Sequence, residues 1–524
     1  MKTELDTNNT SADANQSRLP QVFFLIVLLI FVGARVWRLT ATCLWFDEVF
    51  SIHAAQNTWP ELIRFVAADI IHPPLFYLLL KAWIALGGES LLWLRLLPLT
   101  FATATIAPFY FLCRELNLKP AETNMAFLFM AISGFLIKYA QEVRMYSLLL
   151  FLSVTSIWLL IRYLRRDGSL NSLLVLAACN LLLIYAHYYG WLLIVAQAFV
   201  ALLWYRRKLA SFLLMCAALL LSYVPWIYAV LNFRESGKGL SQNIGWIFRP
   251  RPGDIGEYFV LLTKPFLYSQ STLDRANGYV LGCLILLLVG IAIGFLIFRR
   301  WRGGRFADPK RVIIVLAFVP VILAALLSWL LPYSVWGSRH LIICAVPFFV
   351  LAGLAVARLG PPSLKAAVFI TFGCIVTLAG AIYLLKPAPR FSWCAWNDLV
   401  SQIPTNPDRS APMIYTFEDL VAYHLWFAGT QSTNRPITVT VVKGLPGVPD
   451  DPAYFLPRRF DNVVVIGPTG IQGQHIWIAF RARRWNEQAP PVSDLRALEY
   501  ELGNVMSMPA QGEQAFLVEL WRKQ

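Results

Sequence analysis

Apolar runs long enough to cross a lipid bilayer recur along this chain from residue 20 to residue 385. A membrane-spanning helix needs about 20 predominantly apolar residues. The sequence therefore predicts a polytopic α-helical membrane protein. The candidate spans are residues 20–39, 90–113, 122–139, 144–164, 170–186, 188–205, 209–231, 278–298, 311–331, 339–357 and 364–385.

The balance of charge supports this class. Only 14% of the residues are charged, against about a quarter in a soluble domain. The net charge of +15 comes from basic residues that cluster in short loops between apolar runs, as orientation signals do. No basic stripe or nucleic-acid motif is present, so we expect no nucleic-acid partner. Arg35 and Arg38 follow the first run in place of a cleavage site, which predicts an uncleaved first span.

The run at residues 73–86 is treated differently, because it has only fourteen residues and contains Lys81. Its length suits a helix lying at the membrane surface. With this helix flat and the N-terminus cytoplasmic, nearly every dense Lys/Arg cluster falls inside, as the positive-inside rule requires. The inside loops are then residues 114–120, 162–168, 205–208, 299–305 and 357–365.

This topology divides the chain into three parts. Residues 1–19 form a cytoplasmic tail, and residues 20–385 form the transmembrane domain with outer loops at 40–89 and 232–277. Residues 386–524 are polar and proline-rich. They contain the β-like runs PMIYT, ITVTVV, NVVVIG and HIWIAF and a helical stretch, DLVAYHLWFA, which together predict a small extracytoplasmic α/β domain.

The eight cysteines show neither a C-x-x-C pair nor metal-ligand spacing. Six lie in or beside apolar runs, where small core residues are expected. Cys43 and Cys394 both fall on the predicted outer side. The favoured interpretation leaves them unpaired, with a disulfide as the alternative.

Ionisable residues from separate parts of the sequence gather at the predicted outer face. Such residues at membrane depth are costly and usually functional. For any one of them alone, snorkelling or a structural ion pair is the better explanation. Their collection on one side favours a site for an anionic substrate. The set is Asp47, Glu48, His72, Glu142, Arg144, His187, Arg339 and His340.

Asp47 and Glu48 stand between aromatic residues in LWFDEVF. Acidic residues favour the first turn of a helix, which is the structural interpretation. Adjacent side chains on a helix point about 100° apart, so one carboxylate can act chemically while the other orients it. A carboxylate shielded by aromatic rings is a suitable general base.

The basic residues suit phosphate binding. The planar fork of Arg144 matches a phosphate, and Glu142 and Tyr146, at i and i+4, would share a helical face. Arg339 and His340 open a span, where backbone N–H groups bind anions. Simple anchoring of these helix ends is the alternative for both segments.

Three further residues have structural alternatives. His72 precedes two prolines that suit a helix start, and it is a candidate for substrate contact. His187 is either a site residue or a packing histidine. Lys264 either holds a lipid head group or snorkels to the interface.

Three stretches together carry a family resemblance: LWFDE with HPPLFYLLLKAW, YAQEVRMYSL, and SRHLIICAVPFFVLAG. They resemble the GT-C superfamily of membrane glycosyltransferases, and most closely the family 39-like branch of protein O-mannosyltransferases and lipid A aminoarabinose transferase. The resemblance covers roughly residues 20–385. It implies transfer of a sugar, with inversion, from a polyprenyl-phosphate carrier to an acceptor outside the cytoplasmic membrane. It also implies that Asp47 is the catalytic base.

The chemistry of such a transfer makes matching demands. A base must take the acceptor proton, and cations or N–H donors must stabilise the departing lipid phosphate. We expect no cofactor and no metal, although Glu142 leaves a divalent ion open as an alternative. The acceptor is a glycan, a lipid or a protein. Competing interpretations are a lipid flippase or transporter and a lipid-linked glycan polymerase or ligase, which does not need the acidic motif.

Overall fold

The computed structural model describes most of the chain. The described residues are 5–165, 169–233, 240–266, 272–301, 309–388, 391–404, 411–431, 437–448, 454–510 and 512–523. They form two compact units. The first, here called the helical unit, comprises Met1–Leu39, Ile71–Asn232 and Ile247–Pro387. The second, here called the sheet unit, comprises Thr40–Ile70, Phe233–Trp246 and Ala388–Gln524.

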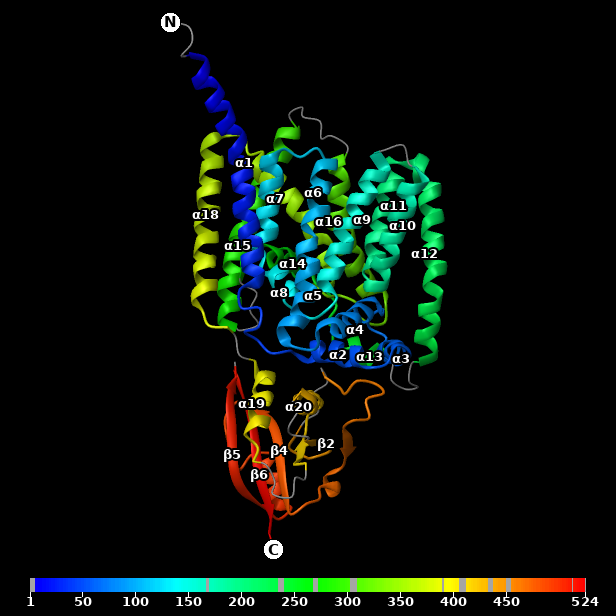
Figure 1. Cartoon of the computed structure of the whole chain (residues 1–524), viewed down its shortest axis with the longest axis vertical. Coiled ribbons are helices and arrows are strands. Elements are labelled where there is room, and N and C mark those ends of the chain that lie inside the picture. Colours follow the sequence, from blue (N-terminus) through cyan, green and yellow to red (C-terminus); the bar gives the residue numbers. More distant parts are fainter. Residues whose placement is uncertain are drawn as a thin grey trace. The chain divides into compact units, whose positions relative to one another are not determined.

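The helical unit is built mainly from long apolar helices whose axes lie roughly along one direction (Figure 1). Its helices are α1 (Leu5–Val36), α4 (Leu75–Gly87), α5 (Leu91–Ala104), α6 (Ile106–Glu115), α7 (Pro120–Ile132), α8 (Gly134–Ala140), α9 (Tyr146–Arg165), α10 (Leu170–Ala186), α11 (Gly190–Trp204), α12 (Arg206–Phe233), α14 (Pro252–Thr263), α15 (Thr272–Trp301), α16 (Pro309–Leu330), η1 (His340–Cys344), α17 (Ala345–Ala357) and α18 (Pro362–Leu385).

Within the described residues, seven helical segments are long and apolar enough to cross a membrane. Shorter apolar helices occur at Pro20–Val36, Leu75–Gly87, Leu170–Ala186 and Gly190–Trp204. The predicted polytopic helical class is therefore confirmed. Helix α4 has 13 residues and measures about 20 Å, which is shorter than the roughly 30 Å of a hydrocarbon core. It lies across the direction of the longer helices (Figure 1).

The predicted span at 122–139 is not one helix, because it breaks between α7 and α8 at Ser133. The guanidinium of Arg35, which is buried, donates to the carbonyls of Met130 and Ala131 at the end of α7. The segment after α14 pairs with the backbone on both sides of the break. Phe266 N–H donates to Ile132 O, and Gly134 N–H donates to Lys264 O. These contacts satisfy backbone groups that a broken helix would otherwise leave unpaired in lipid.

A closed ring of polar side chains joins three of the long helices. Ser156 on α9 donates to Asn180 Oδ1 on α10, Asn180 donates to Gln197 Oε1 on α11 at 3.1 Å, and Gln197 donates back to Ser156 Oγ at 2.6 Å. All three residues are fully buried. Because each of the three side chains both donates and accepts within the ring, the ring fixes the mutual register of these helices.

Helices α7 and α17 approach each other closely at Gly353. A Cβ atom built at Gly353 would lie 2.4 Å from the backbone nitrogen of Ala126 on α7. Small residues at helix contacts allow this kind of backbone approach in membrane proteins. A side chain at this position would therefore force the two helices apart.

The sheet unit contains one mixed sheet and several helices. The strands are β1 (Met413–Thr416), β2 (Thr438–Val442), β3 (Val464–Ile466), β4 (His475–Ala482), β5 (Tyr500–Ala510) and β6 (Glu513–Arg522). The helices are α2 (Phe46–Gln56), α3 (Trp59–Asp69), α13 (Leu240–Ile244), η2 (Ser392–Cys394), α19 (Ala395–Gln402), α20 (Asp419–Gln431), η3 (Pro468–Gly470) and α21 (Val492–Ala497).

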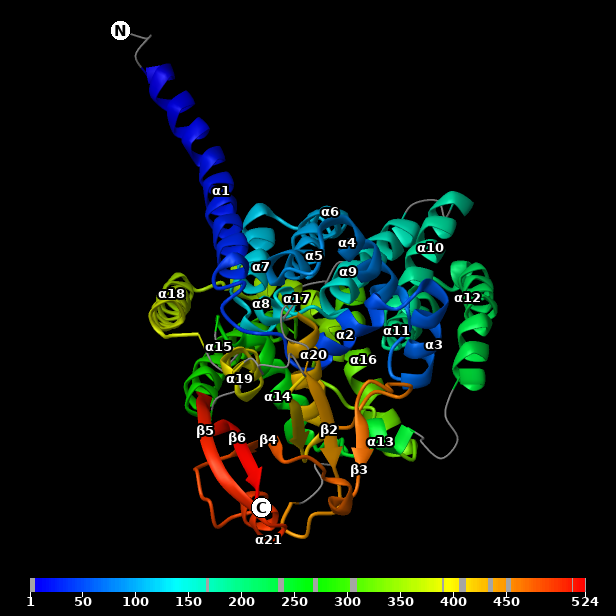
Figure 2. The same cartoon turned by 60° about the horizontal axis from the view of Figure 1, so that its bottom comes forward.

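The strand order is β3-β2-β1-β4-β6-β5, which can be followed in Figure 2. Strands β3, β2, β1 and β4 are parallel, whereas β6 is antiparallel to both β4 and β5. Helix α20 is the crossover between the parallel strands β1 and β2, as parallel pairing requires. The four β-like runs singled out in the sequence form β1 to β4. The sequence analysis did not single out β5 and β6.

Three separated stretches of sequence are tied together in the sheet unit. Arg458 is buried, and its guanidinium donates to the carbonyls of Ala68, at 2.8 Å, and Asp69, at 3.1 Å, at the end of α3. Asn243 donates to Asp69 O at 3.1 Å. Cys43 and Cys394 form a disulfide, so the interpretation that left them unpaired was wrong.

The contact at Gly353 gives a test of the helical packing. Gly353→Ala should destabilise the protein by about 1–3 kcal/mol, because the added methyl group overpacks α7 against α17. Gly373→Ala is the matched control, since a Cβ at Gly373 on α18 meets nothing within 4 Å. Thermal unfolding in detergent should show a lower Tm for the first variant only. An equal Tm for both would contradict this packing.

Candidate anion site in the helical unit

Three histidines from separate loops meet in the helical unit. His72 precedes α4, His187 ends α10, and His340 begins η1. The ring centroids of His187 and His340 are 4.7 Å apart, and those of His72 and His187 are 5.3 Å apart. One ring nitrogen from each of the three lies within 4.8 Å of the others. The structure therefore brings together three of the residues predicted for the site.

Local sequence explains how these rings reach one another. His187 adopts an extended backbone that ends α10, and Gly190 completes the turn into α11. A Cβ at Gly190 would lie 2.9 Å from Leu183 O, so only glycine fits this turn without a shift. Gly337 plays a similar part for His340, because a Cβ there would lie 2.4 Å from the His340 ring nitrogen Nδ1.

Two arginines border the histidines. Arg144 is 3% exposed, and its guanidinium donates to His72 Nδ1 and to Tyr77 Oη, both at 3.4 Å. The Arg339 guanidinium carbon lies 5.8 Å from the ring centroid of Tyr146, and that ring stacks with His340 at 6.1 Å. Two full positive charges therefore lie beside the three imidazoles.

The hydrogen bonds determine which nitrogen of each ring carries the proton. Arginine is always a donor, so Nδ1 of His72 accepts from Arg144. Nδ1 of His187 accepts from the backbone N–H of Tyr189 at 3.1 Å. In a neutral imidazole one nitrogen accepts and the other donates. The Nε2 atoms of His72 and His187 are therefore N–H donors, and both are buried without a partner in the described part of the protein.

The neutral form of both rings follows from their surroundings. Burial, and then the charge of Arg144, hold the pKa of His72 well below its usual value. Burial also lowers the pKa of His187 to about 3, with Arg144 and Arg339 contributing in the same direction. Because a lowered histidine pKa favours the neutral ring above that pH, both rings are neutral at pH 7.

This donor set suits an anion better than a metal ion. A metal-bound imidazole offers a lone pair to the ion, and its other nitrogen usually donates to a carboxylate or carbonyl. Here the other nitrogens of His72 and His187 accept hydrogen bonds, and two arginines would repel a cation. The N–H groups and guanidinium groups instead match the oxygens of a phosphate.

Two predicted site residues have other surroundings. Helix α9 begins at Tyr146, so Glu142 lies in the preceding turn, and the predicted shared helical face does not form. Glu142 Oε2 lies 3.8 Å from Lys138 Nζ. Lys264 caps the end of α14, and its ammonium group lies 5.4 Å from the Tyr279 ring centroid. The contacts of Lys264 place it at the α7–α8 break.

Asp47 and Glu48 belong to the sheet unit, in the first turn of α2. Glu48 is 2% exposed, and its Oε2 accepts the backbone N–H of Trp45 at 3.1 Å, which caps the helix start. Asp47 is half-buried, and its backbone carbonyl accepts from Ser51 Oγ. The two carboxylates therefore differ in their structural roles, with Glu48 fixing the helix on which Asp47 stands.

Sequence reasoning missed two tyrosines at the site. Tyr77 is fully buried on α4 and contacts Arg144, and Tyr189 packs its ring against His340 at 5.0 Å. The hydroxyl of Tyr189 donates to Val335 O. Tyr77 follows the HPP segment by three residues. This spacing was the available signal, because it places Tyr77 in the first turn of α4, at the end that follows His72.

No protein-family model and no curated protein matches the sequence. Solved structures do resemble it. The chain is similar to ArnT from Cupriavidus metallidurans bound to undecaprenyl phosphate, with a TM-score of 0.56 and 12% identity over 95% of this chain and 97% of ArnT. The apo structure of the same ArnT gives a TM-score of 0.55 with equal identity and coverage. This likeness shows that the chain shares the fold of ArnT.

The preference for anions over cations gives a second prediction. Inorganic phosphate should raise the Tm of the purified protein in detergent, because ligands that bind only the folded state stabilise it. Zn²⁺ at the same concentration should not. Arg144→Gln should abolish the phosphate effect, and Arg249→Gln, which alters an exposed arginine that donates to Leu331 O, should retain it. Stabilisation by zinc alone would contradict the anion assignment.

Proposed function

We propose that this protein is an inverting membrane glycosyltransferase that takes a sugar from a polyprenyl-phosphate donor. The observation that carries the proposal is a donor set within a GT-C fold, formed by the buried His72, His187 and Arg144 and the half-buried Arg339. A lipid phosphate is the anion expected inside a membrane protein of this fold. The ArnT structure that resembles this chain was determined with undecaprenyl phosphate bound, which supports the same class of ligand.

In the proposed reaction the phosphate is the leaving group. The acceptor oxygen attacks the anomeric carbon, the bond between that carbon and the phosphate oxygen breaks, and the electron pair leaves with the polyprenyl phosphate. Negative charge therefore grows on the phosphate oxygens. Arg144, Arg339 and the two Nε2–H groups would stabilise it without reorganisation, since their geometry is already set. His340 and Tyr146 complete the lining of the proposed phosphate site.

We assign the proton transfer to Asp47. The acceptor must lose a proton as its oxygen bonds to the sugar, and a carboxylate is a suitable base. Glu48 is a positioning residue in this proposal, because its carboxylate is engaged by the Trp45 N–H. Asp47 lies beside Glu48 in the first turn of α2.

We further propose that the site and the C-terminal region face the extracytoplasmic side of the cytoplasmic membrane. The basic loops between spans support this orientation through the positive-inside rule. The Cys43–Cys394 disulfide supports it independently, because disulfides form and persist in oxidising compartments. The acceptor is then an extracytoplasmic glycan, lipid or protein.

The proposed activity predicts that two substitutions at the site lower turnover. Release of polyprenyl phosphate is measured from synthetic polyprenyl-phosphate sugars in the presence of cell-envelope lipids and glycans. Asp47→Asn should lower kcat about 10²–10⁴-fold, as loss of a general base does. Arg144→Ala should lower kcat about 10²–10³-fold, as loss of transition-state charge stabilisation does.

Glu61→Gln is the matched control for Asp47→Asn, because Glu61 is an exposed carboxylate of the neighbouring helix α3. Its turnover should equal that of the unaltered protein. Unchanged turnover in both Asp47→Asn and Arg144→Ala would refute the site assignment. Tolerance of Asp47→Asn together with loss at Arg144→Ala would favour a lipid-linked glycan polymerase or ligase.

The proposed orientation is tested separately by cysteine labelling. Asn397 is exposed on α19, so Asn397→Cys offers an accessible thiol. A membrane-impermeant maleimide added to intact cells should label it without permeabilisation. A cysteine at exposed Arg207, at the start of α12, should react only after permeabilisation. The reverse pattern would overturn the topology.

A further inference from the structure

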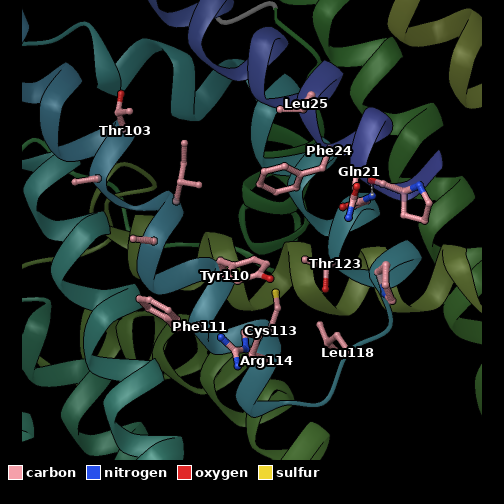
Figure 3. Close-up of a pocket in the computed structure, with 16 residues that line it drawn as sticks. Gln21, Phe24, Leu25, Thr103, Tyr110, Phe111, Cys113, Arg114, Leu118 and Thr123 are labelled. Carbon is pink, nitrogen blue, oxygen red and sulfur yellow. Dashed lines mark hydrogen bonds between the residues drawn. The ribbon is translucent and has the colours of Figure 1, made fainter. Parts of the chain in front are cut away.

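A second candidate binding site lies in the helical unit, among residues that the proposed reaction does not use. A cavity of about 1120 Å³ opens between α1, the α5–α6 pair and α7. Figure 3 shows Phe24 and Leu25 of α1 on one side, Tyr110 and Phe111 of α6 on another, and Thr123 of α7 closing the space. The volume exceeds the roughly 300–1,000 Å³ of a typical small-molecule pocket.

The shape of the cavity follows from the chain around it. Helix α5 ends at Ala104 and α6 begins at Ile106, so the wall bends at Thr105. From Thr103 to Arg114 this wall is roughly 16 Å long, at 1.5 Å per residue. Small residues, including Ala104 and Ala107, line the wall and leave the space open.

The lining is suited to hydrocarbon. Tyr110 and Phe111 are 46% and 40% exposed, and Leu25 is 56% exposed. These side chains lie within predicted membrane spans, so lipid rather than water faces them. A void of this size without atoms would forfeit many dispersion contacts, and the surrounding bilayer supplies chains that fill it.

One end of the cavity is positively charged. Arg114, in the last turn of α6, lines the cavity beside Phe111 (Figure 3). Among the described residues Arg114 has no ion-pair partner, and Glu122, in the first turn of α7, is engaged by Arg358 at 2.6 Å. Arg114 opens the 114–120 loop, which the charge pattern assigns to the cytoplasmic side. An apolar cavity with one cationic end matches a lipid with an anionic head group.

We propose that this cavity binds an anionic glycerophospholipid of the cytoplasmic leaflet. The acyl chains lie between α1 and α6, and Arg114 holds the phosphate of the head group. This site is separate from the histidine cluster. It therefore implies a lipid dependence of the protein that does not involve the transferred sugar or its carrier.

The test measures lipid binding directly and needs no transfer assay, so its result is independent of the proposed activity. Purified protein in mild detergent is mixed with phosphatidylglycerol or with phosphatidylcholine of the same acyl chains, and bound lipid is counted by native mass spectrometry. We expect phosphatidylglycerol to bind about fivefold more tightly, the effect of one basic residue near a head group.

Two variants assign the preference to the cavity. Arg114→Gln should bring the two lipids close to parity, whereas the matched Arg207→Gln, which removes a cation from the start of α12, should retain the fivefold difference. Ala107→Trp should lower retention of both lipids by filling the space. Parity of the two lipids in the unaltered protein, or equal behaviour of Arg114→Gln and Arg207→Gln, would overturn the proposal.

Discussion

Two hydrogen bonds determine which nitrogens of His72 and His187 carry protons in the buried centre of the helical unit. Arg144 donates to one nitrogen of His72, and the Tyr189 backbone donates to one nitrogen of His187. Each bond forces the opposite nitrogen to carry a proton. Two of the three imidazoles that could by distance alone surround a cation thus present N–H groups instead. The same residues would have the opposite chemistry if carboxylates took the place of these two donors.

This arrangement is costly for the isolated protein, because buried donors without partners lose their hydration. The surrounding structure holds them in place through helix ends, with α4, α10 and η1 each presenting one histidine. Gly337 lets the backbone approach the His340 ring, and Gly190 lets the turn after His187 approach Leu183 O. Such unsatisfied, preorganised groups are characteristic of ligand sites, where the ligand supplies the missing partners.

Much of the fold could be predicted from the sequence, since length and hydropathy mark the helices that are long and apolar enough to cross a bilayer. The break at Ser133 could not, because it depends on Arg35 and on the segment after α14, both distant along the chain. Strands β5 and β6 were also missed. Gly503 and a register shift between Leu502 and Val505 interrupt the alternation that would identify β5.

The site was predicted in part. Arg144, His187 and His340 were chosen because each is ionisable and near a span end, and this criterion also selected Lys264, which has other contacts. Tyr77 was missed because its spacing from the HPP segment, the one available signal, fits a core tyrosine equally well. Which nitrogen of each histidine accepts a hydrogen bond depends on three-dimensional neighbours, so the distinction between a metal and an anion required the structure.

The sheet unit is formed by stretches that are far apart in the sequence, and this constrains when it can fold. Its disulfide joins cysteines 351 residues apart, and Arg458 holds the end of a helix that is synthesised some 390 residues earlier. Chains emerge from the ribosome N-terminus first. Residues 40–70 must therefore wait, incompletely folded, until Cys394 and Arg458 have been synthesised. Folding of this unit can finish only after the strands that follow residue 388 have been made, which makes the early loop a natural client for chaperones.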